Sequence, residues 1–232
     1  MNEIIVTDHS EYINQFDNFI VCCFYTQSYQ EHAMRLKGSL DKFNLSYYFS
    51  QVEDAGYWEA NTRLKPHFVL ECLNKFPEKD ILYLDADAIV KQPIDYFNNV
   101  NADVAFYKTK GMPGMSHDYL ASTMFFKNTE PTKALVKQWI AEQADGKDTQ
   151  VDQDSLDQAM IKFENKISVE PLPAGYIKIF DKDYHGEIYI EQYQASRGQT
   201  KLRRQKIRRR NRLAGAVLIG AIIVATYVII AG

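Results

Sequence analysis

The sequence predicts an α/β domain of alternating strands and helices, followed by a basic segment and one membrane-spanning helix. Three observations support this arrangement. Short apolar runs alternate with longer segments of helical periodicity over residues 1–200. Residues 201–212 contain eight Lys and Arg and no acid. Residues 213–232 carry no charge, and about 20 apolar residues suffice for a helix to cross a bilayer.

Short apolar runs mark the strands of the predicted sheet. The clearest run, residues 18–26, has the length and apolar character of a buried strand. Further strands are expected at 45–49, 81–84, 103–107, 123–127, 167–179 and 187–193. The run at 81–84 ends at Asp85, so polar residues follow directly from a buried strand.

Helical periodicity predicts the elements that cover the sheet. The first helix is expected to begin with the capping-box spacing of Ser28 and Glu31 and to continue through Met34, Leu40 and Phe43. Further helices are expected at 61–76, from 129 to 146 and at 152–165.

Charge is distributed unevenly along the chain. Of 27 basic residues, eight lie in 201–212, which leaves 19 in the first 200 residues against all 30 acidic residues. A body with this acidic balance argues against nucleic acid as a partner, because phosphate binding needs a basic face. The three cysteines, Cys22, Cys23 and Cys72, show no CxxC spacing and are interpreted as reduced core residues.

The C-terminal part predicts attachment to a membrane. The sequence divides into a folded domain at 1–197, a basic juxtamembrane linker at 198–212 and a transmembrane helix at 213–232. Lys and Arg next to such a helix are retained on the cytoplasmic side, so the folded domain is expected in the cytoplasm, on a single-pass C-terminal anchor. The same charges would attract anionic membrane lipids.

An Asp-x-Asp motif is the main candidate for chemistry. It occurs three times, at Asp85/Asp87, Asp152/Asp154 and Asp181/Asp183, and only Asp85 follows a continuous apolar strand. Ligands of open α/β sheets bind at the carboxyl ends of strands. Two carboxylates spaced by one residue can converge there on one cation, and hard oxygen ligands suit Mg²⁺ or Mn²⁺.

The segments around this motif resemble GT-A-fold glycosyltransferases. Residues 65–70 and a short helix, followed by 80–87, look like the family's central signature, in which a helix packs beside the strand ending in the metal-binding Asp-x-Asp. Residues 18–26, 121–126 and 151–156 resemble the nucleotide-binding strand, the strand near the donor sugar and the Asp-Gln helix start. The resemblance covers roughly residues 18–197. It implies a Rossmann-type mixed sheet flanked by helices and sugar transfer from a nucleotide-diphosphate donor to an acceptor hydroxyl.

The resemblance also implies roles for individual residues. Those expected near the nucleotide and donor sugar are Tyr25, Thr26, Lys65, Asp85, Ser122 and Thr123. Asp154, with Gln153 as second choice, would contact the sugar or act in catalysis, whereas Asp152 looks more like a helix cap. Asp85 and Asp87 would hold Mn²⁺ or Mg²⁺.

A third metal ligand is less clearly marked. His185 is the candidate, because relatives often supply a late His and imidazole is a common ligand. The segment at 190–197 resembles the one where some relatives place that His, but Gln192 stands at the position in this chain. Arg197 could clamp a phosphate or begin the basic linker.

Two other interpretations remain open from the sequence. A haloacid-dehalogenase-like phosphatase also places Asp-x-Asp after an apolar strand, although its motif usually lies near the start of the chain. A catalytically inactive, membrane-tethered module that binds nucleotide sugars is the other. For the transferase, membrane attachment points to a lipid-linked or envelope glycan as acceptor.

Overall fold

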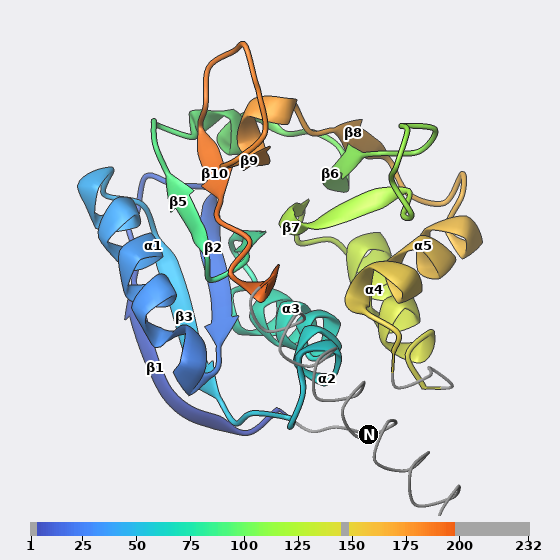
Figure 1. Ribbon diagram of the computed structural model, residues 1–232, viewed down its shortest axis with the longest axis horizontal. Helices are drawn as coiled ribbons and strands as arrows, with labels where there is room; N and C mark the ends of the chain where they lie inside the picture. Colours follow the sequence, from blue (N-terminus) through green and yellow to red (C-terminus); the bar gives the residue numbers. More distant parts are fainter. Residues whose placement is uncertain (1–3, 145–148, 198–232) are drawn as a thin grey trace, which may run out of the picture. The chain divides into compact units, whose positions relative to one another are not determined.

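The computed structural model describes residues 4–144 and 149–197 (Figure 1). The chain divides into two compact units, Met1–Gln194 and Ala195–Gly232, and every strand and helix named below belongs to the first. The basic segment at 198–212 and the membrane span expected at 213–232 lie outside the described residues. Within the described part, no helix is long and apolar enough to cross a membrane.

A seven-stranded sheet forms the centre of the described unit. Its strand order is β1-β3-β2-β4-β7-β6-β8, and a small second sheet has the order β5-β10-β9. The strands are β1 (Val6–Tyr12), β2 (Phe19–Tyr25), β3 (Tyr47–Val52), β4 (Asp80–Leu84), β5 (Ala88–Val90), β6 (Val104–Lys108), β7 (Tyr119–Phe126), β8 (Val169–Pro171), β9 (Lys178–Ile179) and β10 (Ile190–Gln192). The helices are α1 (Gln30–Lys42), α2 (Trp58–Thr62), α3 (Lys65–Lys75), α4 (Glu130–Ala141) and α5 (Asp152–Lys162).

The direction of chain crossover changes at β2. This strand pairs in parallel with β3 on one side and with β4 on the other. The chain therefore leaves β2 through α1 toward one edge of the sheet and later returns through α3 to its other side. Such a reversal leaves a crevice at the carboxyl ends of the two strands, where ligands of α/β sheets bind. The motif that follows β4 lies at this reversal.

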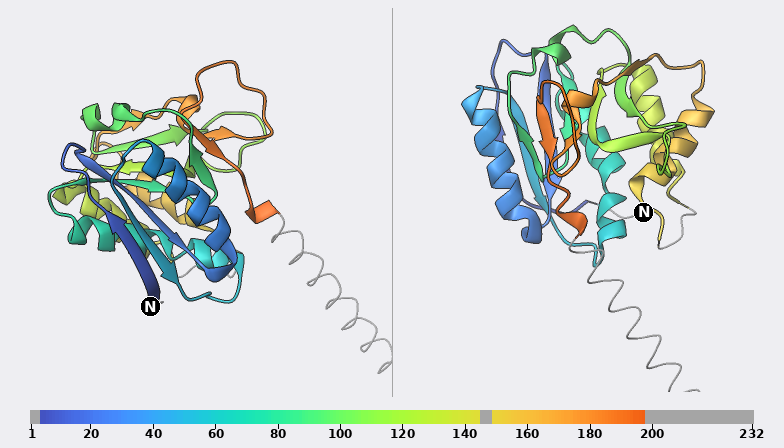
Figure 2. Two further views of the ribbon diagram at one scale, coloured as in Figure 1. Left: turned by 90° about the vertical axis from the view of Figure 1, so that its left-hand side faces the viewer. Right: turned by 45° about the horizontal axis from the view of Figure 1, so that its top comes forward.

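Two apolar cores sandwich the main sheet. Alternate residues of β2 point to opposite faces, so Ile20 and Cys22 join one core and Val21 and Cys23 the other. The first core is closed by α3, α4 and α5, and the second by α1 together with β5 and β10 (Figures 1 and 2). The mixed sheet flanked by helices that the sequence predicts is confirmed.

The first helix differs from its expected form. Ser28 does not cap it: the Ser28 hydroxyl lies 3.0 Å from the Thr26 hydroxyl, and a 3-10 turn at Gln27–Tyr29 precedes α1, so the capping-box prediction is wrong. The buried face of α1 consists of Ala33, Leu36 and Leu40, while Met34 is exposed. Two polar residues of α1, His32 and Arg35, line a pocket together with Asp87 of the motif after β4.

Candidate active site

The Asp85-Ala86-Asp87 segment links the two sheets. Asp85 follows β4 and its backbone N–H donates to the carbonyl of Ser122, 3.0 Å away. The backbone N–H of Ala88, the first residue of β5, then donates to the carbonyl of Asp85 at 2.9 Å, which forms a tight turn. Strand pairing on both sides of this turn therefore fixes the two carboxylates at the sheet reversal.

Lys65 is buried against the first of these carboxylates. Its ammonium lies 3.0 Å from Asp85 Oδ1, forms an ion pair with Asp152 and donates to the carbonyl of Ala121 at 2.8 Å. The Tyr83 hydroxyl donates to the same Asp85 oxygen at 3.1 Å. An ammonium has three N–H donors, and here each has an acceptor. Lys65 therefore orients Asp85, and its N–H groups are already engaged before any phosphate approaches.

The charges of this cluster stabilise one another. Burial alone would lower the pKa of Lys65, but the charges of Asp152 and Asp85 outweigh burial and raise it above its usual value. Burial raises the pKa of the Asp152 carboxyl, and Lys65 opposes this shift. We interpret the group as a charged lysine shared between two carboxylates.

The start of α5 places its first acidic residues differently from the sequence interpretation. Asp154, the third residue of the helix, contributes to capping, because its Oδ2 accepts the backbone N–H of the N-cap residue Val151 at 2.8 Å; its side chain is 42 % exposed. Asp152, interpreted from sequence as the cap, is instead 3 % exposed and paired with Lys65. Gln153 Nε2 donates to the carbonyl of Tyr119 at 3.1 Å and ties this helix to β7.

Ser122 and Thr123, the residues expected to line the donor pocket, lie on β7 next to the motif. Thr123 is fully buried, and its hydroxyl accepts from Gln192 Nε2 at 2.9 Å. Gln192 Nε2 also approaches the Ser122 carbonyl at 3.4 Å. Gln192 pairs with Ala88 in the small sheet, and the next backbone N–H, of Tyr193, donates to the carbonyl of Asp87 at 3.1 Å.

These residues fit a divalent cation. Gln192 is 2 % exposed, and its amide oxygen is buried without a hydrogen-bond partner in the described structure. Together with Asp85 and Asp87 it offers carboxylate and amide oxygens, the ligands that Mg²⁺ and Mn²⁺ prefer. Across residues 4–144 and 149–197, no group of three or more His, Cys, Asp and Glu side chains is placed to hold a metal.

His185 therefore does not complete a ligand set with Asp85 and Asp87. It lies exposed in the segment between β9 and β10. The register of β10 brings Gln192, seven residues later, beside Ala88. The choice of His185 rested on residue type, whereas the position next to the motif is determined by strand pairing.

Three predicted site residues remain, two of them at a strand end of the described sheet. Tyr25 and Thr26 are buried at the end of β2. Burial raises the pKa of Tyr25, with a further contribution from Asp8. Arg197 belongs to the other unit of the chain, Ala195–Gly232.

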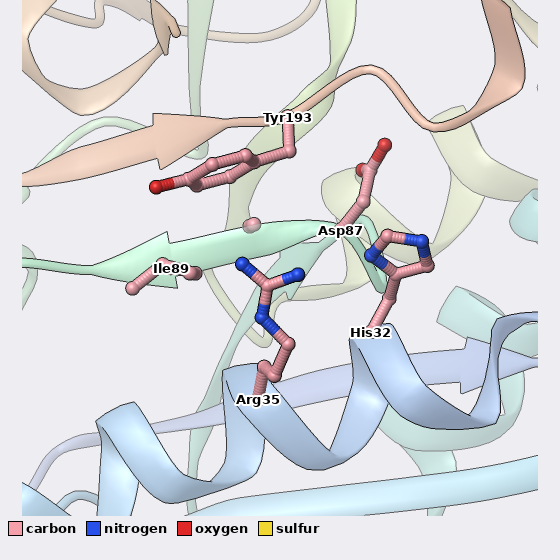
Figure 3. Close-up of a pocket in the computed structure, with 6 residues that line it drawn as sticks. His32, Arg35, Asp87, Ile89 and Tyr193 are labelled. Atoms are coloured by element: carbon pink, nitrogen blue, oxygen red, sulfur yellow. The ribbon is translucent and has the colours of Figure 1, made fainter.

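The sequence interpretation missed a group of residues at and just before the start of α1. Tyr29, His32 and Arg35 recur every third residue, and the latter two line a pocket with Asp87 (Figure 3). Burial raises the pKa of the Tyr29 hydroxyl, and the negative charges of Asp87 and Asp85 raise it further. The spacing of three was a usable signal, because such residues lie on one side of a helix.

Comparison with solved structures gives the same fold. A glycosyltransferase involved in glycosylation of the major capsid of PBCV-1 superposes with a TM-score of 0.60 at 14% identity, covering 78% of this chain and 95% of that one. Glycosyltransferase GlyE of Streptococcus pneumoniae TIGR4 gives 0.51 at 14% identity, covering 76% and 54%. Mouse xyloside xylosyltransferase 1 gives 0.50 at 11% identity, covering 77% and 98%. At these identities the likeness concerns the fold alone.

A comparison of sequences identifies the family of this chain. Residues 17–204 match the family described as nucleotide-diphospho-sugar transferase, which is well over half of the chain. No curated protein sequence matches this chain closely. The chain therefore belongs to the nucleotide-diphospho-sugar transferase family and is a GT-A-fold glycosyltransferase that uses a nucleotide-sugar donor.

Proposed function

We propose that this glycosyltransferase is metal-dependent and moves a sugar from a nucleotide-diphosphate donor to an acceptor hydroxyl, with Mg²⁺ or Mn²⁺ bound at Asp85 and Asp87. The observation that carries the proposal is the position of the motif. Both carboxylates lie at the reversal of the sheet, between a buried lysine cluster and a buried, unpartnered amide oxygen of Gln192. When bound, the cation supplies positive charge for the departing nucleotide diphosphate.

The chain's own residues orient the metal ligands and the donor. Lys65 and the Tyr83 hydroxyl both contact Oδ1 of Asp85. These two contacts fix the side-chain conformation of Asp85 and therefore the direction of its second oxygen. Gln192 is oriented through its Nε2 contacts to Thr123 and Ser122, which leaves its oxygen as the free end of the amide. His185 is not retained as the third ligand.

The start of α5 would face the transferred sugar. Trp139 fixes this helix start by donating from Nε1 to the carbonyl of Asp152 at 2.9 Å and to the Ser155 hydroxyl at 3.1 Å. We assign contact with the donor sugar to Asp152 and Gln153, with Asp154 retained as the alternative catalytic carboxylate. The basis is that Asp152 joins the Lys65–Asp85 cluster directly.

A panel of nucleotide sugars tests this proposal. We expect the full-length chain to release nucleoside diphosphate from one donor in the presence of Mn²⁺ or Mg²⁺ and not in excess chelator. Asp87→Ala should lower turnover at least about 100-fold at an unchanged melting temperature. Asp183→Ala is the matched control, because Asp183 belongs to another Asp-x-Asp and is exposed.

Other outcomes would identify the alternatives. Full activity of Asp87→Ala would remove the metal assignment. Hydrolysis of a generic aryl phosphate would favour phosphatase chemistry, which the family match argues against. Metal-dependent binding of a nucleotide sugar without any turnover would indicate an inactive binding module.

We further propose that the enzyme acts at a membrane surface, on the cytoplasmic side. The support comes from the sequence: eight basic residues at 201–212 precede an uncharged span of twenty residues. An acceptor that is lipid-linked or part of an envelope glycan would fit this location.

A further inference from the structure

A polar stripe on α1 faces the second carboxylate of the motif. His32 and Arg35 lie on the helix, and Tyr29, three residues before His32, is the last residue of the 3-10 turn that precedes it. Figure 3 shows the side chains of His32 and Arg35 directed toward β5 and toward Asp87, which immediately precedes that strand. The pocket between them is lined by His32, Arg35, Asp87, Ala88, Ile89 and Tyr193.

Arg35 is held in place by an aromatic ring rather than by an acid. Its guanidinium lies 5.3 Å from the centroid of the Tyr193 ring, which is itself stacked on Phe180 at 5.5 Å. Throughout the described structure, no carboxylate forms an ion pair with Arg35. A guanidinium that contacts a ring and forms no ion pair with an acid keeps its N–H groups available for bidentate hydrogen bonds to an anion.

The pocket has an accessible cation next to the proposed metal site. Lys65 cannot fill this role, because its three N–H groups are taken by Asp85, Asp152 and the carbonyl of Ala121. A nucleoside diphosphate gains one negative charge when the sugar leaves it. Arg35 and His32 border the same pocket as Asp87 and are therefore placed to compensate that charge.

We propose that His32 and Arg35 form a diphosphate-binding subsite of this enzyme, contacting the phosphates of the donor and of the released nucleoside diphosphate beside Asp87. The inference rests on the proposed function, because it assumes a nucleotide diphosphate at the motif. Tyr29 closes the end of the stripe nearest the motif: its buried hydroxyl has no hydrogen-bond partner in the described structure and lies in the field of Asp87 and Asp85. Arg35 supplies the main contact, and His32 supplies a second N–H donor.

Calorimetric binding of nucleotides to the full-length chain in detergent tests the subsite. The probes are the diphosphates and monophosphates of uridine, guanosine, adenosine and cytidine, each with Mg²⁺. For the base that the wild type prefers, Arg35→Gln should raise the Kd of the diphosphate about tenfold, equivalent to about 1.4 kcal/mol. The Kd of the monophosphate should change less than about twofold, and His32→Asn should give a smaller effect with the same selectivity.

Lys37→Gln provides the matched control. Lys37 is on the same helix and also lies over a tyrosine ring, that of Tyr47 at 5.4 Å, but it does not line the pocket. Its variant should bind both nucleotides as the wild type does. Arg35→Lys, which keeps the charge without the planar fork, should recover part of the diphosphate affinity.

The outcomes separate the subsite from the enzyme assignment. If Arg35→Gln binds the diphosphate like the wild type, the subsite is overturned while the proposed function stands. Equal losses for mono- and diphosphate, or a lowered melting temperature, would also overturn it, because they indicate a general effect on the fold. If the wild type binds no nucleoside diphosphate, the proposed function fails and the subsite with it.

Discussion

A buried lysine organises the site through three contacts of its own. Lys65 is 4 % exposed, and the charge of a side chain this deeply buried has to be compensated by neighbours. Asp85 and Asp152 provide that compensation, and the ring of Tyr83 lies 5.0 Å from the ammonium. The lysine therefore acts on the proposed metal site by fixing Asp85, which is a positioning role.

Removal of this lysine should destabilise the protein strongly. Lys65→Met leaves Asp85 and Asp152 as uncompensated carboxylates, and breaking a buried ion pair from one side costs about 3–5 kcal/mol. We expect a loss of this size in the free energy of unfolding, measured by urea titration. The double variant Lys65→Met/Asp152→Leu should recover part of it. A loss below about 1 kcal/mol with weakened nucleotide binding would instead support a direct contact of Lys65 with the nucleotide, as expected from sequence.

The residues of the site were predictable to different degrees. Asp85 and Asp87 could be placed because a strand end is defined by the sequence itself, through the apolar run at 81–84. The pairing of Lys65 with Asp152 could not, because 87 residues separate them in the chain and only tertiary packing brings them together. The same holds for Gln192, whose position depends on the register of β10 with β5.

The start of α5 combines a capping role with a position near the site. Asp154→Ala removes the acceptor of the Val151 N–H, and we expect a loss of about 1 kcal/mol in stability. Asp154→Asn keeps an oxygen acceptor and should lose much less. Thermal unfolding of both variants measures the capping contribution. If both also lose turnover to the same extent, Asp154 is catalytic in addition to being a cap.

One carboxylate connects three elements at the far side of the sheet. Asp103, just before β6, accepts the backbone N–H and the hydroxyl of Ser168 at 2.9 and 2.6 Å, and the hydroxyl of Thr129 at 3.3 Å. Burial opposes its ionisation, but the hydrogen bonds from Ser168 and Thr129 outweigh burial and lower the pKa of Asp103. The ionised carboxylate thus joins the start of β6 to the residues before β8 and before α4.

This junction should make stability dependent on acid pH. A carboxyl with a lowered folded-state pKa stabilises the fold above its unfolded pKa, about 3.9, and loses that contribution as the pH falls through the folded value. Asp103→Asn should therefore cost about 1 kcal/mol at pH 7, allowing for screening by solvent, and the difference from wild type should shrink as the pH falls from 7 toward 3. Urea titrations at both pH values measure it. A difference that is constant with pH would mean that the charge of Asp103 contributes nothing.

Physical reasons explain why some strands were not predicted from the sequence. Strand β1 is an edge strand whose residues are mostly exposed, so it lacks the apolar alternation that marks a half-buried strand. Strand β5 has three residues and forms only because β10 pairs with it. The single helix expected at 61–76 is divided into α2 and α3. By contrast, β2 and β4 are continuous apolar runs and lie close to their predicted bounds.

For the molecule as a whole, strand order explains why one short motif can organise the site. The reversal at β2 brings the ends of β2 and β4 together, and β7 pairs with β4 so that Ser122 and Thr123 lie beside Asp85. Alternating strands and helices predicted an α/β sheet, and the ordered resemblance of its segments predicted the GT-A arrangement. The antiparallel pairing of β4 with β7 was not accessible from periodicity, because the pattern of a buried strand is the same in either direction.

Membrane attachment, predicted from the sequence, is a property of the whole chain that fractionation of cells measures. We expect the full-length chain to sediment with membranes and to stay there after alkaline carbonate washing, because a span of about 20 apolar residues holds a helix in the bilayer without help from charge. A chain ending at residue 197 should be recovered in the supernatant, and its melting temperature should equal that of the full-length chain. Replacement of the eight basic residues at 201–212 by Gln should leave sedimentation intact but disturb orientation, since Lys and Arg determine which side is retained. Protease added outside intact cells should therefore spare the folded unit of the wild type and cleave part of the Gln variant. Sedimentation of the chain ending at 197 would show instead that the folded unit binds the membrane through its own surface.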